Sequence, residues 1–252
     1  MPISSSQPDI SIIVPSYNAG GLAVRSARNL DSYFRNTPLQ FEIVLVDDGS
    51  SKHERPNPAE FPATATLIQL EKNQGKGFAV RTGLLAACGR CRVFTDVDLP
   101  YGIDALARCY SVITEGGADF VYGDRSLPAS TVVAHPSFRR RVSSSVFRFA
   151  VETIVQLPPA DTQCGLKGLS GAVADALGPL LRTNHFAFDV EIFKCAIDSG
   201  LRMQAIPVEL VNEDISTVRL MRDSVTMLRD LVAIRRRAGR GNYRMDLRTA
   251  PA

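Results

Sequence analysis

The sequence predicts an α/β fold with a mixed, mainly parallel sheet flanked by helices, and two observations support this prediction. First, short apolar segments rich in β-branched residues alternate with segments of helical periodicity through the first half of the chain, as in βαβ units. Second, the apolar segments are continuous, as in strands buried on both faces. The 252 residues, 45% of them hydrophobic, suffice for one large domain with a sizeable core.

Five strands are expected in the first half, separated by helices and by one surface loop over residues 52–65, which holds three prolines. The expected strands cover residues 10–15, 41–46, 66–70, 92–95 and 119–122, and the helices follow Gly21 to about Asn36 and cover 78–88 and 103–115.

After residue 125 the regular alternation stops, and mainly helices are expected. The pattern predicts helices over 137–157, 171–181, 188–199 and 218–237, a compact loop or short strand over 161–168, and a strand over 203–210. We expect a single domain over residues 1–240 and a flexible tail over 241–252.

Composition excludes some classes of function. A net charge of +3 is too small to indicate a nucleic-acid partner. Five cysteines, an odd number, include one C-x-x-C without a second pair, which favours free thiols in a reducing cytosol. The first ten residues lack a secretory pattern, and no window reaches the ~18 apolar residues of a membrane span. The expected location is cytoplasmic, either free or peripheral at the inner face of the membrane.

Two carboxylates, Asp96 and Asp98, follow the strand at 92–95. Alternate side chains of an extended segment share a face, so both can point at one spot. Hard oxygen ligands suit Mg²⁺ or Mn²⁺ carrying a diphosphate. The alternative is a solvated loop that happens to hold two acids.

Polar residues at 16–18, 47–48 and 96–98 all follow expected parallel strands. In open α/β sheets, ligands bind outside the carboxyl ends of the strands. The shared placement therefore predicts one site at this edge.

Six segments, SIIVPSYN, EIVLVDDGS, NQGKGFAVRTG, TDVDLP, DTQCGLK and FAFDVE, resemble in order and spacing the family 2 glycosyltransferases. The likeness spans about residues 10–236 and is strongest to the branch of dolichyl-phosphate glucosyltransferase and dolichyl-phosphate mannose synthase. It implies a GT-A fold, a nucleotide-diphosphate sugar donor, a divalent metal ion and inversion at the anomeric carbon.

The resemblance also implies roles for individual residues. Asp96 and Asp98 would hold the metal ion, with Asp98 as the likelier direct ligand. Arg125, Arg139 and Arg140 would bind the acceptor phosphate, to which the fork of a guanidinium is suited. The donor site would be formed by Pro15, Tyr17, Asp47, Asp48, Lys76, Asp96, Gln163 and Lys167, and the catalytic candidates are Asp98, Arg125, Asp189 and Glu191.

We therefore expect a metal-dependent, inverting transfer of a hexose to a phosphorylated acceptor, most simply a polyprenyl phosphate. A soluble hydroxyl acceptor is the alternative, and Asp189 or Glu191 would then act as the base. A non-catalytic nucleotide-sugar binder also remains. The missing G-x-G-x-x-G after the first strand argues against a nicotinamide-dependent oxidoreductase, and the missing glycine- and arginine-rich loop argues against a nucleotidyltransferase.

One departure concerns the segment after the last strand, where relatives carry a cation and this chain has Ile215-Ser216-Thr217. The donor base, UDP or GDP, and the oligomeric state stay open. The basic start of the 137–157 helix is expected at an anionic membrane surface. In the last helix, Met221, Val225, Leu228 and Val232 are expected to pack on the sheet while the arginines face water.

Overall fold

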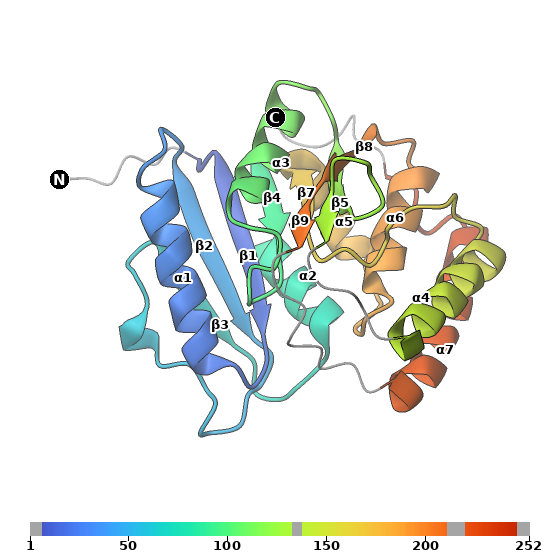
Figure 1. The fold of residues 1–252 in the computed structure, drawn as a ribbon, viewed down its shortest axis with the longest axis horizontal. Coiled ribbons are helices and arrows are strands. Elements are labelled where there is room, and N and C mark those ends of the chain that lie inside the picture. The colour runs from blue at the N-terminus through green and yellow to red at the C-terminus, as the bar shows by residue number, and fades with distance from the viewer. Residues whose placement is uncertain (1–6, 133–137, 211–219, 246–252) are drawn as a thin grey trace.

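The computed structural model describes residues 7–132, 138–210 and 220–245, and at its centre is a seven-stranded sheet in the order β3-β2-β1-β4-β7-β5-β8 (Figure 1). β7 is antiparallel to both of its neighbours, and the other strands of this sheet are parallel to one another. The strands are β1 Ile10–Ser16, β2 Phe41–Asp47, β3 Ala65–Gln69, β4 Cys91–Phe94, β5 Phe120–Asp124, β7 Lys167–Ser170 and β8 Met203–Pro207. The predicted mixed, mainly parallel α/β fold is confirmed.

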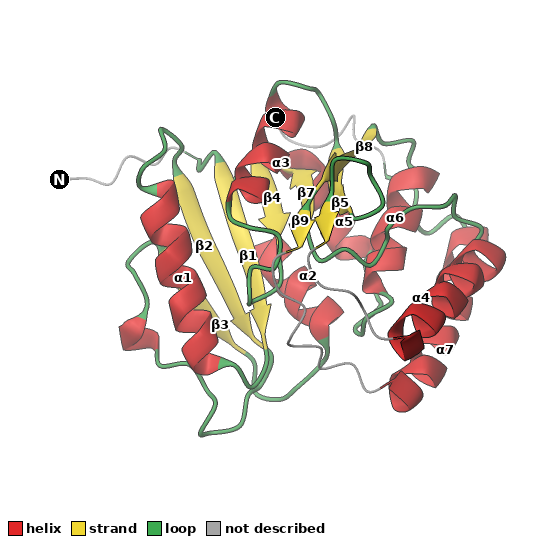
Figure 2. Cartoon of the chain, in the orientation of Figure 1, coloured by secondary structure: helices red, strands yellow, loops and turns green. Residues whose placement is uncertain are grey.

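Helices cover both faces of the sheet, as Figure 2 shows. In β1, Ile12 packs with α1 and α3, and Ile13 packs with α2 on the opposite face, because successive side chains of a strand point to opposite sides. Each fully buried aliphatic side chain contributes about 1.5–3 kcal/mol. The helices are α1 Gly20–Phe34, α2 Lys76–Ala86, α3 Asp104–Thr114, α4 Phe138–Ala150, α5 Gly171–Leu177, α6 Phe188–Asp198 and α7 Leu220–Gly239.

β7 is the element that determines what reaches the site. The sequence predicts a compact loop or short strand over residues 161–168, and the structure has a loop up to residue 166 followed by β7, which lies between β4 and β5. Because β7 is antiparallel, its first residue, Lys167, pairs with Phe94 and Tyr122 near the carboxyl ends of β4 and β5. The loop that precedes β7 therefore lies at the predicted site edge.

Two short elements complete the second half. A small parallel sheet joins β6 Thr131–Val132 to β9 Glu209–Leu210. The predicted 137–157 helix is α4 followed by a π-helical segment, η2 Val151–Val155. Arg139 and Arg140 lie in the first turn of α4, and their side chains are outside the described part, as are Ile215-Ser216-Thr217.

The chain beyond residue 240 departs from the predicted flexible tail. Tyr243 is 1% exposed and donates its hydroxyl to Glu191 Oε1 at 2.6 Å. Its ring joins the core formed by α6 and α7. Residues up to 245 therefore belong to the folded domain, and residues 246–252 lie outside the described ranges.

The stripe on α7 also differs from expectation. Leu228 and Val232 are 46% and 38% exposed, while Leu231 and Ile234 are fully buried. The predicted packing of Leu228 and Val232 on the sheet is therefore wrong, and the apolar face that packs inward lies further round the helix. Among the described residues, no helix is both long and apolar enough to cross a bilayer.

Candidate active site

The carboxyl ends of β1, β2 and β4 lie side by side, as predicted from the strand ends. Ser16 is abreast of Asp47, and the Asp48 amide donates to the Ser16 carbonyl at 2.8 Å. The Thr95 amide, just before Asp96, donates to the Ile13 carbonyl at 3.1 Å. The three acidic or polar strand ends are thus brought to one edge.

The loops after β1 and β2 are tied together by a reciprocal pair of hydrogen bonds. The Asn18 amide donates to Ser50 Oγ at 2.8 Å, and the Ser51 amide donates to Asn18 Oδ1 at 2.9 Å. Asn18 has a φ of 49°, a left-handed conformation that asparagine tolerates. Pro15 is buried, whereas Tyr17 is 46% exposed and offers a flat ring to a ligand.

Asp47 and Asp48 have different roles despite being adjacent. Asp47 is fully buried; Ser50 donates to its Oδ1, while its Oδ2 has no hydrogen bond and lies 3.7 Å from Arg55 Nε. Asp48 accepts from the amides of Gln74 and Gly75, both at 2.8 Å. Asp48 therefore holds the loop before α2, and its role in donor binding stays a prediction.

Lys76, the first residue of α2, forms an ion pair with Asp96, with Nζ 2.5 Å from Oδ1. Burial alone would raise the pKa of Asp96, but the charges of Lys76 and Lys167 more than offset it and hold that pKa below its usual value. Burial would likewise lower the pKa of Lys76, but Asp96 and Asp189 together raise it. Both groups are therefore charged at neutral pH.

A second pair lies deeper. Lys167 Nζ is 2.6 Å from Asp189 Oδ1 and donates to the Cys164 carbonyl, and both charged side chains are nearly inaccessible. Burial raises the pKa of Asp189, and Lys167 opposes that effect. Lys167 thus has internal partners where contact with the donor was predicted, and Asp189 is not presented to solvent.

Asp98 is half-buried, as Asp96 is, and has no ion pair within the described part of the chain. Burial, and then the charge of Asp96, raise its pKa. Its side chain lines a hollow of about 390 Å³ together with Arg25 and Leu99. Gly165 lies directly against the Asp96 carboxylate, where a Cβ would overlap Oδ2.

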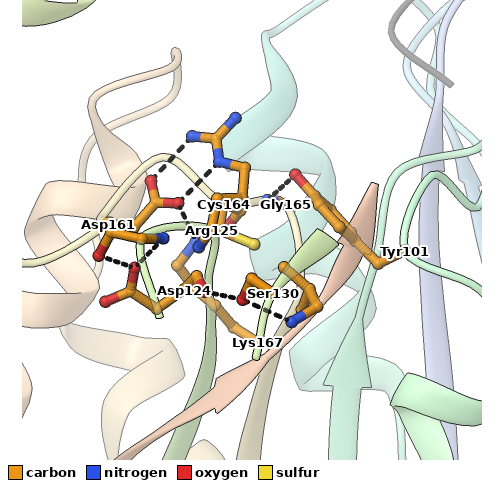
Figure 3. Close-up of polar contacts among 10 residues, drawn as sticks. Tyr101, Asp124, Arg125, Ser130, Asp161, Cys164, Gly165 and Lys167 are labelled. Carbon is orange, nitrogen blue, oxygen red and sulfur yellow. Dashed lines mark hydrogen bonds and ion pairs between the residues drawn. The ribbon is translucent and has the colours of Figure 1, made fainter. Parts of the chain in front are cut away.

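Arg125 is bound by Asp161, as Figure 3 shows. Its Nε and Nη2 lie 2.7 and 2.8 Å from the two carboxylate oxygens, and its amide donates to the same carboxylate at 3.1 Å. Burial would lower the pKa of Arg125, but the hydrogen bonds that it donates to Asp161 raise that pKa. The predicted role at the acceptor phosphate is therefore restricted, because this side of the guanidinium fork is already occupied.

Three buried polar atoms at this edge have no hydrogen-bond partner in the described residues: Ser16 Oγ, Asp47 Oδ2 and Gln163 Nε2. Buried polar groups are nearly always paired in folded proteins. They come from three segments that share the carboxyl edge of the sheet. A polar ligand that accepts from Gln163 and donates to Asp47 would satisfy them.

Glu191, predicted as a catalytic acid, is fully buried in the first turn of α6. Its Oε2 accepts from the amides of Arg182 and Thr183 at 3.0 and 2.7 Å. Its Oε1 accepts from the Tyr243 hydroxyl and forms an ion pair with Arg237 at 3.0 Å. Each of these contacts is internal to the protein, and the catalytic role of Glu191 stays a prediction.

Sequence reasoning missed three contributors to the site. Asp161 holds Arg125, Ser50 links Asp47 to Asn18, and the Tyr101 hydroxyl accepts from the Gly165 amide at 3.1 Å. Asp161 begins the D-T-Q-C-G-L-K segment, and Ser50 follows Asp47 within V-D-D-G-S. The sequence predicts roles for other residues of these two motifs, Asp47 and Asp48 in the first and Gln163 and Lys167 in the second.

Together the sheet, its paired charges and its edge of unpartnered polar atoms define an α/β protein with a polar ligand site, of the GT-A type. Residues 11–147 match the model of the family described as glycosyl transferase family 2. The chain belongs to this family, and it is a glycosyltransferase.

Among curated relatives, the dolichyl-phosphate beta-glucosyltransferase of Dictyostelium discoideum is 29% identical over 243 residues, covering 90% of this chain and 73% of the relative. The protein with the same description from Saccharomyces cerevisiae is 29% identical over 264 residues, covering 93% and 76%. Among solved structures, glucosyl-3-phosphoglycerate synthase from Mycobacterium tuberculosis bound to uridine diphosphate aligns with a TM-score of 0.63 at 16% identity, covering 92% of this chain and 80% of that one. This likeness confirms the GT-A fold.

Glu191→Ala should destabilise the protein strongly, because it leaves Arg237 and two amides without their acceptor. Removing one partner of a buried ion pair costs about 3–5 kcal/mol, and this loss is measured by urea denaturation. Glu71→Ala, at an exposed acid, is the control and should change stability by less than about 0.5 kcal/mol. An Ala variant as stable as wild type but inactive would support the catalytic role.

Gly165→Ala should weaken nucleotide binding and stability together, because the added methyl displaces Asp96 from Lys76. Overpacking of this kind costs about 1–3 kcal/mol. Gly21→Ala is the matched control, since a Cβ there meets nothing within 4 Å. If both variants behave alike in denaturation and in calorimetry with nucleotide, the close approach of Gly165 to Asp96 has no consequence.

Proposed function

We propose that the protein transfers glucose from a nucleotide-diphosphate glucose to a polyprenyl phosphate. The observation that carries the donor half is that three buried polar atoms in segments at the carboxyl edge, Ser16 Oγ, Asp47 Oδ2 and Gln163 Nε2, have no hydrogen bond within the described residues. The acceptor and the sugar are supported by relatives described as dolichyl-phosphate beta-glucosyltransferases over most of this chain.

A divalent cation, Mg²⁺ or Mn²⁺, fits the residues present. Within the described ranges, no three His, Cys, Asp or Glu side chains gather closely enough to hold a metal by themselves. Mg²⁺ is usually held by one or two carboxylates together with substrate phosphates and water, and Asp98 with Asp96 supplies those carboxylates. When bound, the cation would neutralise the charge on the leaving diphosphate. A solved neighbour of this fold contains Mn²⁺ with UDP-glucose.

The chain's own residues account for donor binding and orientation. Tyr17 offers its ring to the base, and Asp47 Oδ2 accepts from a base or ribose donor. Lys76 would reach the diphosphate from the start of α2, where its ammonium lies 2.5 Å from Asp96 and its side chain is 20% exposed. Gln163 Nε2 donates to the sugar or the acceptor.

The state of the acids favours a phosphorylated acceptor over a hydroxyl. A hydroxyl nucleophile needs a base, and both predicted bases are engaged: Asp189 by Lys167 and Glu191 by Arg237. A phosphate is already ionised and needs none. Attack by the acceptor phosphate in line with the leaving diphosphate would invert the configuration at the anomeric carbon. Holding donor and acceptor in this geometry at the sheet edge would accelerate the transfer.

The proposed acceptor also implies a place. A polyprenyl phosphate stays in the bilayer, so an enzyme that uses it works at the membrane surface. We propose peripheral contact with the cytoplasmic face of the membrane.

Asp98→Asn should abolish the part of nucleotide-diphosphate binding that depends on Mn²⁺, because a neutral amide is a poor ligand for a hard cation. Asp96→Asn should weaken that part less, because Lys76 already occupies one of the Asp96 oxygens. Calorimetry with and without Mn²⁺ measures both, and Asp104→Asn at an exposed acid is the control. Metal-dependent binding retained in Asp98→Asn would exclude it as a ligand.

The proposed reaction is tested by turnover with Mn²⁺ or Mg²⁺, combining UDP-glucose, GDP-mannose and related donors with polyprenyl phosphate or soluble hydroxyl acceptors. The expected product is polyprenyl phosphoglucose, identified by mass spectrometry. Glucosylation of a hydroxyl compound, with no transfer to polyprenyl phosphate, would favour the alternative acceptor. Binding of donors without any transfer would favour a non-catalytic binder.

A further inference from the structure

The second half of the fold exposes large apolar side chains on two neighbouring helices. Val146 and Phe149 on α4 are 62% and 68% exposed, and Leu228 and Val232 on α7 are 46% and 38% exposed. The two helices contact each other and lie together at one end of the molecule, opposite α1 (Figure 1). We call the surface formed by these four side chains the α4/α7 face.

Helical geometry shows that each pair forms a local patch. At about 100° per residue, Val146 and Phe149 are about 60° apart, and Leu228 and Val232 are about 40° apart. The inward faces are satisfied separately, because Leu231 and Ile234 are fully buried and Phe147 packs on the core. The exposed apolar residues are therefore additional to the packing of the domain.

Cations surround the α4/α7 face. On α7, Arg235 lies on one side of the Leu228–Val232 line, and Arg229 and Arg236 lie on the other, since they are within about 100° of Leu228. All three are exposed, as is Arg148 on α4. Three acids lie on these helical segments: Glu152 and Asp230 are half-buried, and the side chain of Asp223 lies outside the described part of the chain.

This charge pattern selects the occupant. A second copy docked through the same face would bring arginines against arginines, because a two-fold interface is self-complementary. An anionic lipid surface offers opposite charge to the arginines and hydrocarbon to Phe149 and Leu228. Basic amphipathic helices with aromatic and leucine side chains bind in the plane of such interfaces.

We infer that the α4/α7 face docks on an anionic bilayer, with Phe149 and Leu228 inserted among the acyl chains and the arginines at the headgroups. The inference rests on the proposed function for its purpose, since a lipid phosphate acceptor must be met at the bilayer. The chain connections suit this role: α4 follows β5 and β6, and α7 follows β9, which pairs with β6. Both helices thus continue from the region where Arg125 lies.

The test measures partition of the full chain onto vesicles of phosphatidylcholine alone and onto vesicles containing phosphatidylglycerol. The wild-type protein should bind the anionic vesicles, and this binding should weaken as the salt concentration is raised. Phe149→Ser with Leu228→Ser should lower the partition coefficient by about tenfold or more. Leu85→Ser, at an apolar residue 52% exposed on α2, is the matched control and should leave it unchanged.

The charge half is tested in parallel. Arg235→Ala with Arg236→Ala should weaken binding to anionic vesicles and flatten its dependence on salt, whereas Arg90→Ala, at an exposed arginine outside this face, should not. Equal binding of wild type to both kinds of vesicle, or unchanged binding in the Phe149 and Leu228 variant, would overturn the inference. So would a wild-type dimer that this variant converts to monomer without loss of vesicle binding.

Transfer assays separate this inference from the proposed function. With a short, water-soluble polyprenyl phosphate and no vesicles, the Phe149 and Leu228 variant should match wild type, and with acceptor in anionic vesicles it should be slower. An equal loss in both assays would mean that these residues act in the site, which contradicts docking. If wild type binds vesicles as described but transfers to no polyprenyl phosphate, docking stands and the proposed function fails.

Discussion

Two lysine–aspartate pairs beneath the carboxyl edge of the sheet are the constraint on which the site depends. Lys167 and Asp189 are almost fully buried 2.6 Å apart, and Lys76 lies 2.5 Å from Asp96. Isolated buried charges are very costly, so Lys167 and Asp189 must keep each other as partners, whereas the Lys76–Asp96 pair is partly exposed. Lys167 begins β7, Asp189 lies in the first turn of α6, Lys76 begins α2 and Asp96 follows β4. The two pairs therefore hold four elements around one edge of the sheet. The site is therefore built in the folded protein before any ligand arrives.

The same constraint divides acids that look alike in the sequence. Four of these acids already bind amides, arginines or lysines and hold loops in place: Asp48, Asp161, Asp189 and Glu191. Asp47 keeps one oxygen whose only ion-pair contact within the described residues is Arg55, at 3.7 Å. Asp98 has no ion pair within the described residues. Only the second group can give new interactions to a ligand without breaking an existing one. Motif membership alone does not make that distinction.

The sequence predicted the parallel half of the fold and the grouping of Ser16, Asp47 and Asp96, because hydrophobic patterning and strand ends are local signals. It did not determine β7 as a central strand, since four residues around a glycine carry little periodicity. Nor did it reveal that Glu191 meets Tyr243, 52 positions away. The packing of Leu228 and Val232 on α7 was predicted wrongly for a different reason. Amphipathicity identifies an apolar face of a helix but does not show whether the protein core or the surroundings contact that face.

The family match ends at residue 147, and this boundary coincides with a division in the site. The residues proposed to bind the donor, Tyr17, Asp47, Lys76 and Asp98, lie within the matched part. Gln163, α7 and Phe149 of α4 lie beyond it, while Arg125 and Val146 lie within it. A shared fold does not fix function: the solved neighbour that holds UDP-glucose is a glucosyl-3-phosphoglycerate synthase, whereas the curated relatives are described by dolichyl phosphate. This favours a common donor half, with acceptor choice set by the second half, where the α4/α7 face lies.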